Sequence, residues 1–221
     1  MVESEFGEIP KGWRVATIEE VSEKVGMGPF GANIKVETFV DDGIPIISGQ
    51  HLKGTLVEDN DYNFITVSHA KKLKNSIVSS GDVIFTHAGN IGQVAYLHSS
   101  AKYEEYIISQ RQFYLRPINE IASGLFLTLF FKSPIGQSRL LANTSSTGVP
   151  SISRPVTYLR SIKVVISTTE IMTRFTELVM SFYNDIACNY FENKTLSNLR
   201  DNLLPKLISG ELEVSQTQTN S

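Results

Sequence analysis

Residues 169–208 contain no glycine and only one proline, Pro205, and this stretch restricts the fold of the chain more than any other. Apolar residues recur in it at every third or fourth position, the spacing of an amphipathic helix that packs against another helix. Roughly 37 helical residues would reach about 55 Å at about 1.5 Å per residue, which is longer than one small domain is wide. We therefore predict a long helix that extends beyond a single domain and is kinked or ended by Pro205.

A heptad register places two apolar ends around a polar middle in this helix. Asn189 falls at an a position, and Asp185 and Glu192 fall at d positions. A buried asparagine at an a position fixes the register and partner of a helix pair at some cost in stability. The predicted pairing residues are Phe175, Leu178, Phe182, Asn189, Leu196, Leu199 and Leu203. The alternative is a helix that packs only on the body of its own chain.

Residues 26–165 are rich in short apolar runs separated by turn residues. Strands are predicted for the runs GIPIISG, SIVSSGDVIFTHAGNIGQVAYL, EYIISQRQFYLRP and YLRSIKVVIS. Helices are predicted for SHAKKLKNS, for NEIASGLFLTLFFKSPIGQSRLLANT with a break at Pro134, and, ahead of this region, for TIEEVSEKV. The expected fold class is α+β, a globular mixed α/β domain followed by the long C-terminal helix.

Bulk composition excludes several classes of protein. The only cysteine, Cys188, rules out an internal disulfide framework and suits a reducing cytosol. The longest apolar runs are far shorter than the roughly 20 residues that cross a bilayer, and the acidic N-terminus lacks a signal-peptide pattern. A cytoplasmic protein with no membrane partner is expected. The net charge is −3, yet residues 26–165 carry 13 Lys or Arg against 10 Asp or Glu, which is compatible with a DNA-facing surface.

The sequence GMGPFG at residues 26–31 fits the G-x-G-x-x-G pattern of dinucleotide-binding loops. Its context does not fit, because a helix-like segment precedes it, a β-like segment follows it, and Pro29 lacks a backbone donor. We expect instead a loop in which glycine allows unusual dihedral angles and close backbone approach. The sequence also lacks a Walker A loop, an HExxH zinc motif, a cysteine pair and the Asn-Pro-Pro motif of adenine methyltransferases. No catalytic residue, metal or cofactor is predicted in this chain.

Six stretches, in this order, resemble the specificity subunit of type I restriction–modification systems: GEIPKGWRVATIEEV, GPFGANIK, GIPIISGQHL, IVSSGDVIFTHAGNIGQVA, STGVPSIS and LRDNLLPKLISGEL. Together they cover nearly the whole chain. The start of the long helix departs from the family pattern, since Ile171 stands after Glu170 where the family has glutamine. A typical subunit carries two recognition domains and two helices in about twice this length, and no internal repeat is found here. The sequence therefore resembles a half-subunit, or one repeat of a longer protein.

This resemblance implies that DNA recognition, methylation and cleavage are carried out by different subunits. The recognition domain would read one half of a two-part DNA target, and antiparallel helix pairs would act as a ruler between two such domains. Modification subunits would methylate adenine with S-adenosylmethionine, and restriction subunits would add ATP-dependent cleavage. The cofactors S-adenosylmethionine, ATP and Mg would belong to those partner subunits, and this chain would be non-catalytic.

The resemblance also divides the chain. A target recognition domain is expected over 1–165, with its DNA-reading body at 26–165, followed by a spacer and dimerisation helix over 166–209 and a flexible tail over 210–221. Lys and Arg neutralise phosphates, whereas amide, hydroxyl and imidazole groups read base edges. The DNA-binding candidates are Lys35, Gln50, His51, Lys71, Lys72, Lys74, Thr86, His87, Asn90, Gln110, Arg111, Ser145, Ser146, Thr147, Ser151 and Arg154. Each also has an ordinary structural interpretation, as part of a turn or of a solvated helix face.

A half-length chain suggests a homodimer in which two copies pair their helices about a two-fold axis. The DNA target would then be an interrupted palindrome, because a two-fold protein matches a two-fold site. Double-stranded DNA, a modification subunit and a restriction subunit are the other expected partners. Two further classes stay open: a recognition module whose partner chain carries both methylating and cutting activities, and a standalone DNA enzyme.

Overall fold

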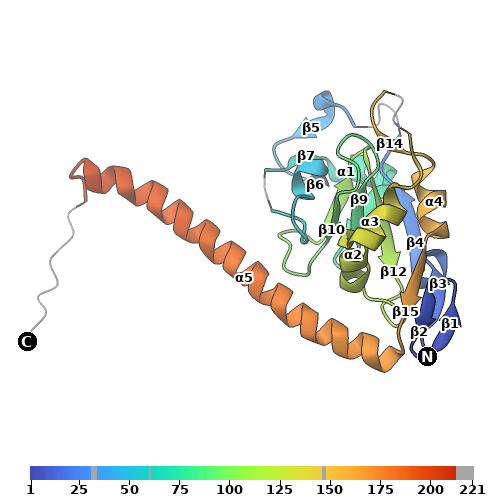
Figure 1. Ribbon diagram of the computed structural model, residues 1–221. Helices are drawn as coiled ribbons and strands as arrows, with labels where there is room; N and C mark the ends of the chain where they lie inside the picture. Colours follow the sequence, from blue (N-terminus) through green and yellow to red (C-terminus); the bar gives the residue numbers. More distant parts are fainter. Residues whose placement is uncertain (31–33, 60, 146–147, 213–221) are drawn as a thin grey trace, which may run out of the picture. The chain divides into compact units, whose positions relative to one another are not determined.

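The computed structural model describes residues 1–30, 34–59, 61–145 and 148–212. The chain divides into two units, Met1–Val179 and Met180–Ser221. The first unit is a sheet-rich domain with helices, and the second consists largely of one long helix (Figure 1). The predicted α+β class with a long C-terminal helix is therefore confirmed. Most of the tail predicted over 210–221 lies outside the described residues.

A four-stranded antiparallel sheet forms the centre of the first unit. Its strand order is β10 (Val94–Tyr96), β9 (Val83–Thr86), β12 (Gln112–Pro117) and β4 (Ser22–Met27). One face packs against α2 (Gly124–Lys132), α3 (Pro134–Leu141), α4 (Pro155–Ser161) and the strand pair β3 (Arg14–Thr17) and β15 (Lys163–Ile166). The break between two helices predicted at Pro134 is confirmed, because α3 begins at that residue.

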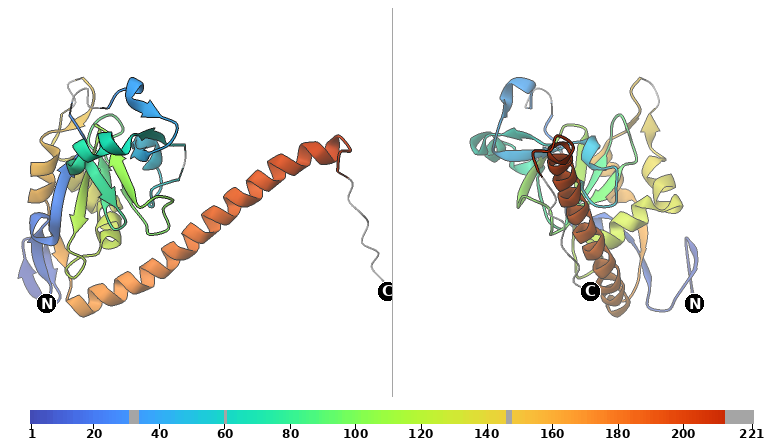
Figure 2. Two further views of the ribbon diagram at one scale, coloured as in Figure 1. Left: turned by 180° about the vertical axis from the view of Figure 1, so that it is seen from behind. Right: turned by 90° about the vertical axis from the view of Figure 1, so that its left-hand side faces the viewer.

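A five-stranded sheet forms the next layer. Its order is β5 (Phe39–Val40), β7 (Asn63–Ile65), β6 (Ile44–Ile47), β11 (Glu105–Ile108) and β8 (Ile77–Ser79), and only β6 and β11 pair in parallel. Helix α1 (Val67–Lys72) covers its outer face by packing Ala70 against the buried Ile65 and Ile107. Figures 1 and 2 show α1 on the side of the two sheets opposite to α2 and α3.

Side chains alternate between the layers along the central strands. In β9, Val83 and Phe85 join the cluster beneath the helices, whereas Ile84 enters the core between the two sheets. In β12, Tyr114 enters the same inter-sheet core. Both faces of these strands are buried, which explains why their sequences are almost continuously apolar instead of alternating with polar residues.

Short elements connect the layers and close the ends of the domain. They are the hairpins β1 (Val2–Ser4) with β2 (Gly7–Ile9) and β13 (Thr144–Ser145) with β14 (Ser151–Ile152), and the 3₁₀ turns η1 (Glu19–Val21), η3 (Val36–Thr38), η4 (Gly49–His51) and η5 (Lys74–Ser76). The helix predicted for SHAKKLKNS is confirmed as α1 followed by η5. Figure 1 shows β14 at the end of the domain opposite to β1 and β2.

The helix predicted for TIEEVSEKV is wrong. Thr17 and Glu20 do form the expected capping contacts, with the Thr17 amide 2.6 Å from the Glu20 carboxylate, but these contacts hold only the single turn η1. The chain then enters β4, whose residues pair with β12. Pairing with a strand that is distant in the sequence has overridden the local helical pattern.

Two predicted strands also need correction. The run EYIISQRQFYLRP forms two strands in different sheets, β11 and β12, separated by a turn at 109–111. The run YLRSIKVVIS is a strand only from Lys163, because its first residues complete α4. A proline at the first position of α4 starts that helix, and a β-branched run follows it.

Helix α5 (Thr169–Ile208) has 40 residues and confirms the predicted long helix. Its first turns pack on the domain. Met172 is buried, the ring of Phe175 lies edge-on to Phe126 with 5.8 Å between ring centroids, and the hydroxyl groups of Thr176 and Ser123 are 2.9 Å apart. Phe175 therefore belongs to the junction with α2, which corrects its assignment to the pairing residues.

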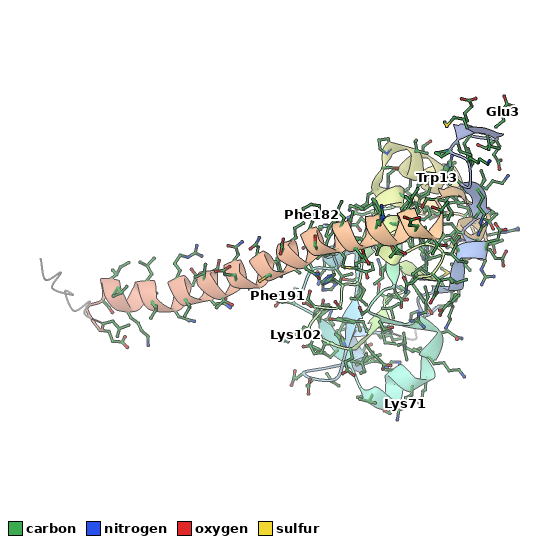
Figure 3. The ribbon with its side chains drawn as sticks, turned by 90° about the horizontal axis from the view of Figure 1, so that it is seen from below. Glu3, Trp13, Lys71, Lys102, Phe182 and Phe191 are labelled. Carbon is green, nitrogen blue, oxygen red and sulfur yellow. The ribbon has the colours of Figure 1, made fainter. Side chains whose placement is uncertain are left out.

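The other six predicted pairing residues are exposed. The exposed fraction is 59% for Leu178, 57% for Phe182, 54% for Leu196 and 50% for Leu199, and Asn189 and Leu203 are exposed as well. Figure 3 shows the side chain of Phe182 projecting from α5. The alternative, a helix that packs only on the body of its own chain, stays a prediction. The register itself stays a prediction.

Of the two effects expected of Pro205, ending the helix is excluded, because α5 continues to Ile208. A proline in the last turn removes only one backbone hydrogen bond. The helix is closed by Gly210 in a left-handed conformation, whose amide donates to the carbonyl of Leu207. Within the described part of the chain, no helix combines the length and the apolarity needed to cross a membrane.

Candidate nucleic-acid interface

Three segments from distant parts of the sequence meet at the end of the domain that carries β14. The amide of His87 donates to the carbonyl of Arg111 at 2.9 Å, and the amide of Ile152 donates to the carbonyl of His87 at 2.8 Å. The amide of Gly89 donates to the carbonyl of Pro150 at 3.1 Å. We call residues 87–90, 109–111 and 150–152 the polar rim. Because backbone hydrogen bonds join all three segments, the rim is a fixed surface and not three independent loops.

Three polar side chains of the rim are exposed: Asn90, Gln110 and Arg111. The Arg111 guanidinium lies beside Gly89, with its Nη1 atom 3.5 Å from the position that a Cβ atom would take there. Amide groups offer both a donor and an acceptor, and a guanidinium offers a planar set of donors. These are the groups that read guanine and adenine edges in the major groove and that bind phosphates.

His87 lies within the rim but is half-buried. Burial lowers the pKa of its imidazole and so disfavours the charged form of the ring. Its Nε2 atom lies 3.1 Å from the carbonyl oxygen of Gln110, which requires that Nε2 carries the proton and donates. The ring therefore helps to hold the 109–111 turn, while part of it is exposed to solvent.

A buried polar network lies directly beneath the rim. Thr86, only 2% exposed, donates to the Oε1 of Gln93 at 3.1 Å and accepts from the Nε2 of Gln112 at 3.3 Å. Gln93 also donates to the carbonyl of Gly49 at 3.1 Å, and Ser109 donates to Gln112. Both hydrogen bonds of the Thr86 hydroxyl are satisfied inside the domain, so Thr86 is a positioning residue, which corrects its prediction as a DNA contact.

His51 needs the same correction. It is 1% exposed, its ring stacks on Tyr62 at 4.4 Å between centroids, and its Nδ1 accepts from the amide of Ser48 at 3.0 Å. Burial lowers the pKa of this ring too. The neighbouring Gln50 is exposed, and its amide donates to the carbonyl of Asp61 at 3.1 Å. His51 therefore holds the 48–51 turn, while the oxygen of Gln50 remains available for a ligand.

The lysine candidates belong to segments other than the three that form the rim. Lys71 and Lys72 are exposed on α1, and Lys74 is exposed in η5. Figure 3 shows Lys71 pointing outward from α1. Lys35 is exposed just before η3.

The remaining candidates belong to the β13–β14 hairpin or its base. Ser145 and Ser151 are half-buried partners in the hairpin, and Ser151 also forms a β-bridge with Ala88 of the rim. Arg154 is exposed and is the only residue other than glycine with a positive φ, +47°, in the described part of the chain. Such a conformation costs energy and is more frequent at functional sites. Ser146 and Thr147 lie outside the described residues.

The glycines of GMGPFG allow close backbone approach. The amide of Gly28 donates to the carbonyl of Gln112 at 2.9 Å, and a Cβ atom at residue 28 would lie 1.9 Å from the carbonyl oxygen of Ser109. A Cβ atom at residue 26 would lie 2.4 Å from the Cε1 atom of the Tyr114 ring. The predicted close approach is confirmed at Gly26 and Gly28, and it joins the end of β4 to the rim at the 109–111 turn. The predicted unusual dihedral angles are wrong for these two glycines, because neither has a positive φ and Gly26 lies within β4. Gly31 lies outside the described residues.

Replacing Gly28 with alanine should destabilise the domain by about 1–3 kcal/mol, because the new Cβ atom forces the end of β4 away from the turn at Ser109. Denaturant unfolding would measure the change. Gly54→Ala is the matched control, because its Cβ atom would meet nothing closer than 3.4 Å. Equal stability of the two variants would contradict the close-packing role of Gly28.

Within the described residues, no three side chains of His, Cys, Asp or Glu form a group that could hold a metal ion.

Known proteins share the sequence pattern and the fold of this chain. Residues 10–194 match the family model described as the type I restriction modification DNA specificity domain. The chain is 23% identical over 205 residues to the type I restriction enzyme HindI specificity subunit of Haemophilus influenzae, covering 92% of this chain and 42% of the relative. It is 25% identical over 216 residues to the MjaIX specificity subunit of Methanocaldococcus jannaschii, covering 95% of this chain and 46% of the relative. The chain thus spans less than half the length of these curated relatives.

Solved structures share the fold. The type I restriction–modification S subunit from M. genitalium superposes with a TM-score of 0.61 at 15% identity, covering 89% of this chain and 46% of that one. The HsdS subunit from Thermoanaerobacter tengcongensis superposes with a TM-score of 0.53 at 16% identity, covering 95% of this chain and 48% of that one. At these identities the likeness concerns the fold.

Proposed function

The chain belongs to the family of type I restriction modification DNA specificity domains, and we propose that it reads one half of a bipartite DNA target through its polar rim. The observation that carries this proposal is the grouping of Asn90, Gln110 and Arg111 on one hydrogen-bonded surface. Side chains that read bases must be held in register with the groove, and a rigid rim provides that register. Ser151 belongs to the rim, and Gln50 and Arg154, on neighbouring segments, extend the proposed surface.

Helix α5 carries the second part of the proposal, in which two copies of the chain pair their helices antiparallel. Leu196, Leu199 and Leu203 are exposed on a helix of 40 residues, and exposed apolar seams of this length are typical of helix–helix interfaces. The curated relatives are more than twice as long as the matched part, so a second copy would supply a second recognition domain and a second helix. The target would then be an interrupted palindrome.

This chain would perform no chemistry in that assembly. It would place modification subunits for adenine N6 methylation, and restriction subunits for cleavage, at the sequence that its rim selects. S-adenosylmethionine, ATP and Mg would be bound by those subunits.

Mapping of methylated adenines in host DNA, with and without the gene for this chain, tests the proposal. We expect an interrupted palindromic motif that loses its methylation when the gene is deleted and regains it on complementation. An unchanged methylation pattern would contradict the proposal. Incubating the purified chain alone with DNA, S-adenosylmethionine and magnesium should give no product, whereas a product would favour a standalone enzyme.

Arg111→Ala should reduce the preference for the mapped target over a scrambled duplex by about 5- to 150-fold, because loss of a bidentate base contact costs about 1–3 kcal/mol. Fluorescence anisotropy with the complex of this chain and its modification subunit would measure both affinities. Arg111→Lys keeps the charge but loses the planar fork, so it should recover affinity without recovering preference. Lys72→Ala is the control, since a phosphate contact would weaken binding to both duplexes equally. A preference unchanged in Arg111→Ala would remove this residue from the readout.

A further inference from the structure

A polar middle interrupts the apolar seam of α5, and it limits how two copies of the helix can pair. The a and d positions between Phe182 and Leu196 hold Asp185, Asn189 and Glu192, and all of these side chains are exposed. In a parallel pair, Asp185 and Glu192 would each face the same carboxylate of the second copy, and like charges repel. An antiparallel pair avoids this repulsion, because each a position then faces a d position of the second copy.

The packing of Phe175 disfavours one antiparallel alignment. Alignments that keep a positions against d positions differ by steps of one heptad, and in one of them Leu199 faces Phe175 of the second copy while Phe182 faces Glu192. The ring of Phe175 packs on Phe126 of its own α2, with 5.8 Å between ring centroids. Leu199, which is 50% exposed, would therefore gain little burial in this alignment, and the exposed ring of Phe182 would be covered by a carboxylate.

The alignment that is one heptad longer matches the residues by polarity. Its two-fold axis passes between residues 190 and 191, which brings Phe182 against Leu199 of the second copy and Asn189 against Glu192. Phe182 and Leu199 are 57% and 50% exposed, so this layer covers apolar surface that is open to water on the single chain. The amide of Asn189 can donate to the carboxylate of Glu192. A further slide by one heptad would bring Leu199 against Asn189, and both matches would be lost.

We propose that two copies of α5 pair antiparallel about an axis between residues 190 and 191, and that this alignment determines the spacer length of the DNA target. This inference rests on the proposed homodimer and assigns its alignment. Sliding the pair by one heptad changes the distance between the starts of the two α5 helices by about 10 Å, which is about three base pairs of DNA. The apolar layers on both sides of the axis therefore select one spacing of the two half-sites.

Cross-linking through Cys188 tests the alignment. Cys188 is exposed at a g position, and the g positions of antiparallel helices face each other. In the proposed alignment Cys188 faces Thr195 of the second copy, whereas it faces Cys188 in the shorter alignment and Asn202 in the longer one. Bismaleimidoethane joins only thiols that lie close together, and one heptad separates two residues by about 10 Å along a helix. Thr195→Cys should therefore form the covalent dimer at least about 10-fold faster than the parent chain or Asn202→Cys, as measured on denaturing gels.

One control carries a thiol only at the new position. The variant with Cys188→Ser and Thr195→Cys should cross-link no faster than the parent chain, because the two copies of residue 195 do not face each other in the proposed alignment. The inference is overturned if dimeric Thr195→Cys cross-links no faster than the parent chain or than Asn202→Cys. A parent chain that sediments as a monomer under the same conditions refutes the proposed homodimer itself, which is a separate and recognisable result.

A second variant tests the alignment without a cross-linker. Asp185 faces Leu196 of the second copy in the proposed alignment, but it faces Asn189 in the shorter one. Asp185→Leu should lower the Kd of the dimer by at least about 10-fold, because it buries apolar side chains against each other in two symmetric layers. Asp201→Leu makes the same change at an exposed f position outside the seam and should leave the Kd unchanged. Equal Kd values for these two variants in sedimentation equilibrium would contradict the alignment.

Discussion

Replacing both Leu196 and Leu203 with glutamate should dissociate the proposed dimer into monomers and abolish methylation of the proposed bipartite target. Burial of one leucine side chain contributes about 1.5–3 kcal/mol, and the double variant removes four such side chains from a two-fold interface. The loss is at least about 6 kcal/mol, which raises the dissociation constant by about 10⁴-fold. Sedimentation velocity, with and without the modification subunit, would measure the association state.

The matched control places the same two charges on another face of α5. Asn184 and Asn198 occupy c positions in the heptad register, away from the a and d seam, and both are exposed. The variant carrying Asn184→Glu and Asn198→Glu should stay dimeric and active. If the parent chain is a monomer at high concentration even with the modification subunit present, pairing through α5 is refuted.

Local signals predicted the parts of the fold that depend on nearby residues. The absence of glycine and the apolar spacing located α5, and Pro134 located the start of α3, because both features act within a few turns of helix. The segment before Gly26 was mispredicted for the complementary reason. Its capping pair Thr17 and Glu20 is real, but the choice of strand for Ser22–Met27 depends on pairing with β12, which lies about 90 residues away in the sequence.

The site shows the same limit at the level of side chains. Of the DNA-binding candidates chosen by residue type, Asn90, Gln110 and Arg111 are exposed, whereas Thr86 and His51 are buried. Burial of Thr86 depends on two glutamines, Gln93 and Gln112, that arrive from other segments. The sequence held one signal of this buried network. Gln112 begins the apolar strand QFYLRP, and a glutamine that is buried with such a strand needs a hydrogen-bond partner inside the domain.

The packing of Phe175 illustrates why a seam cannot be read to its end from periodicity alone. Phe175 and Phe182 occupy equivalent a positions, yet Phe175 contacts Phe126 of α2 while Phe182 is exposed. The heptad spacing extends into the first turns of α5 because the same spacing suits packing against a partner helix and packing against a domain surface. The seam proposed for pairing therefore begins at Leu178.

Deleting residues 189–192 should shorten the spacer of the methylated target by about two base pairs. Four residues remove about 6 Å of helix, and one base-pair step is about 3.4 Å. The deletion also rotates the distal face by only about 40°, because four residues are close to one helical turn of about 3.6 residues, so the seam stays nearly in phase. Mapping of methylated adenines in cells that carry only the variant would show the new spacing directly.

A substitution that keeps the helix length separates the ruler from the loss of particular side chains. Replacing residues 189–192 with alanines removes the same groups, including Asn189, and leaves the rise of the helix unchanged. That variant should methylate the original spacing, whereas the deletion should not. An unchanged spacing in the deletion variant would mean that α5 does not set the distance between half-sites, and the two recognition domains would then have to be positioned by the modification subunits alone.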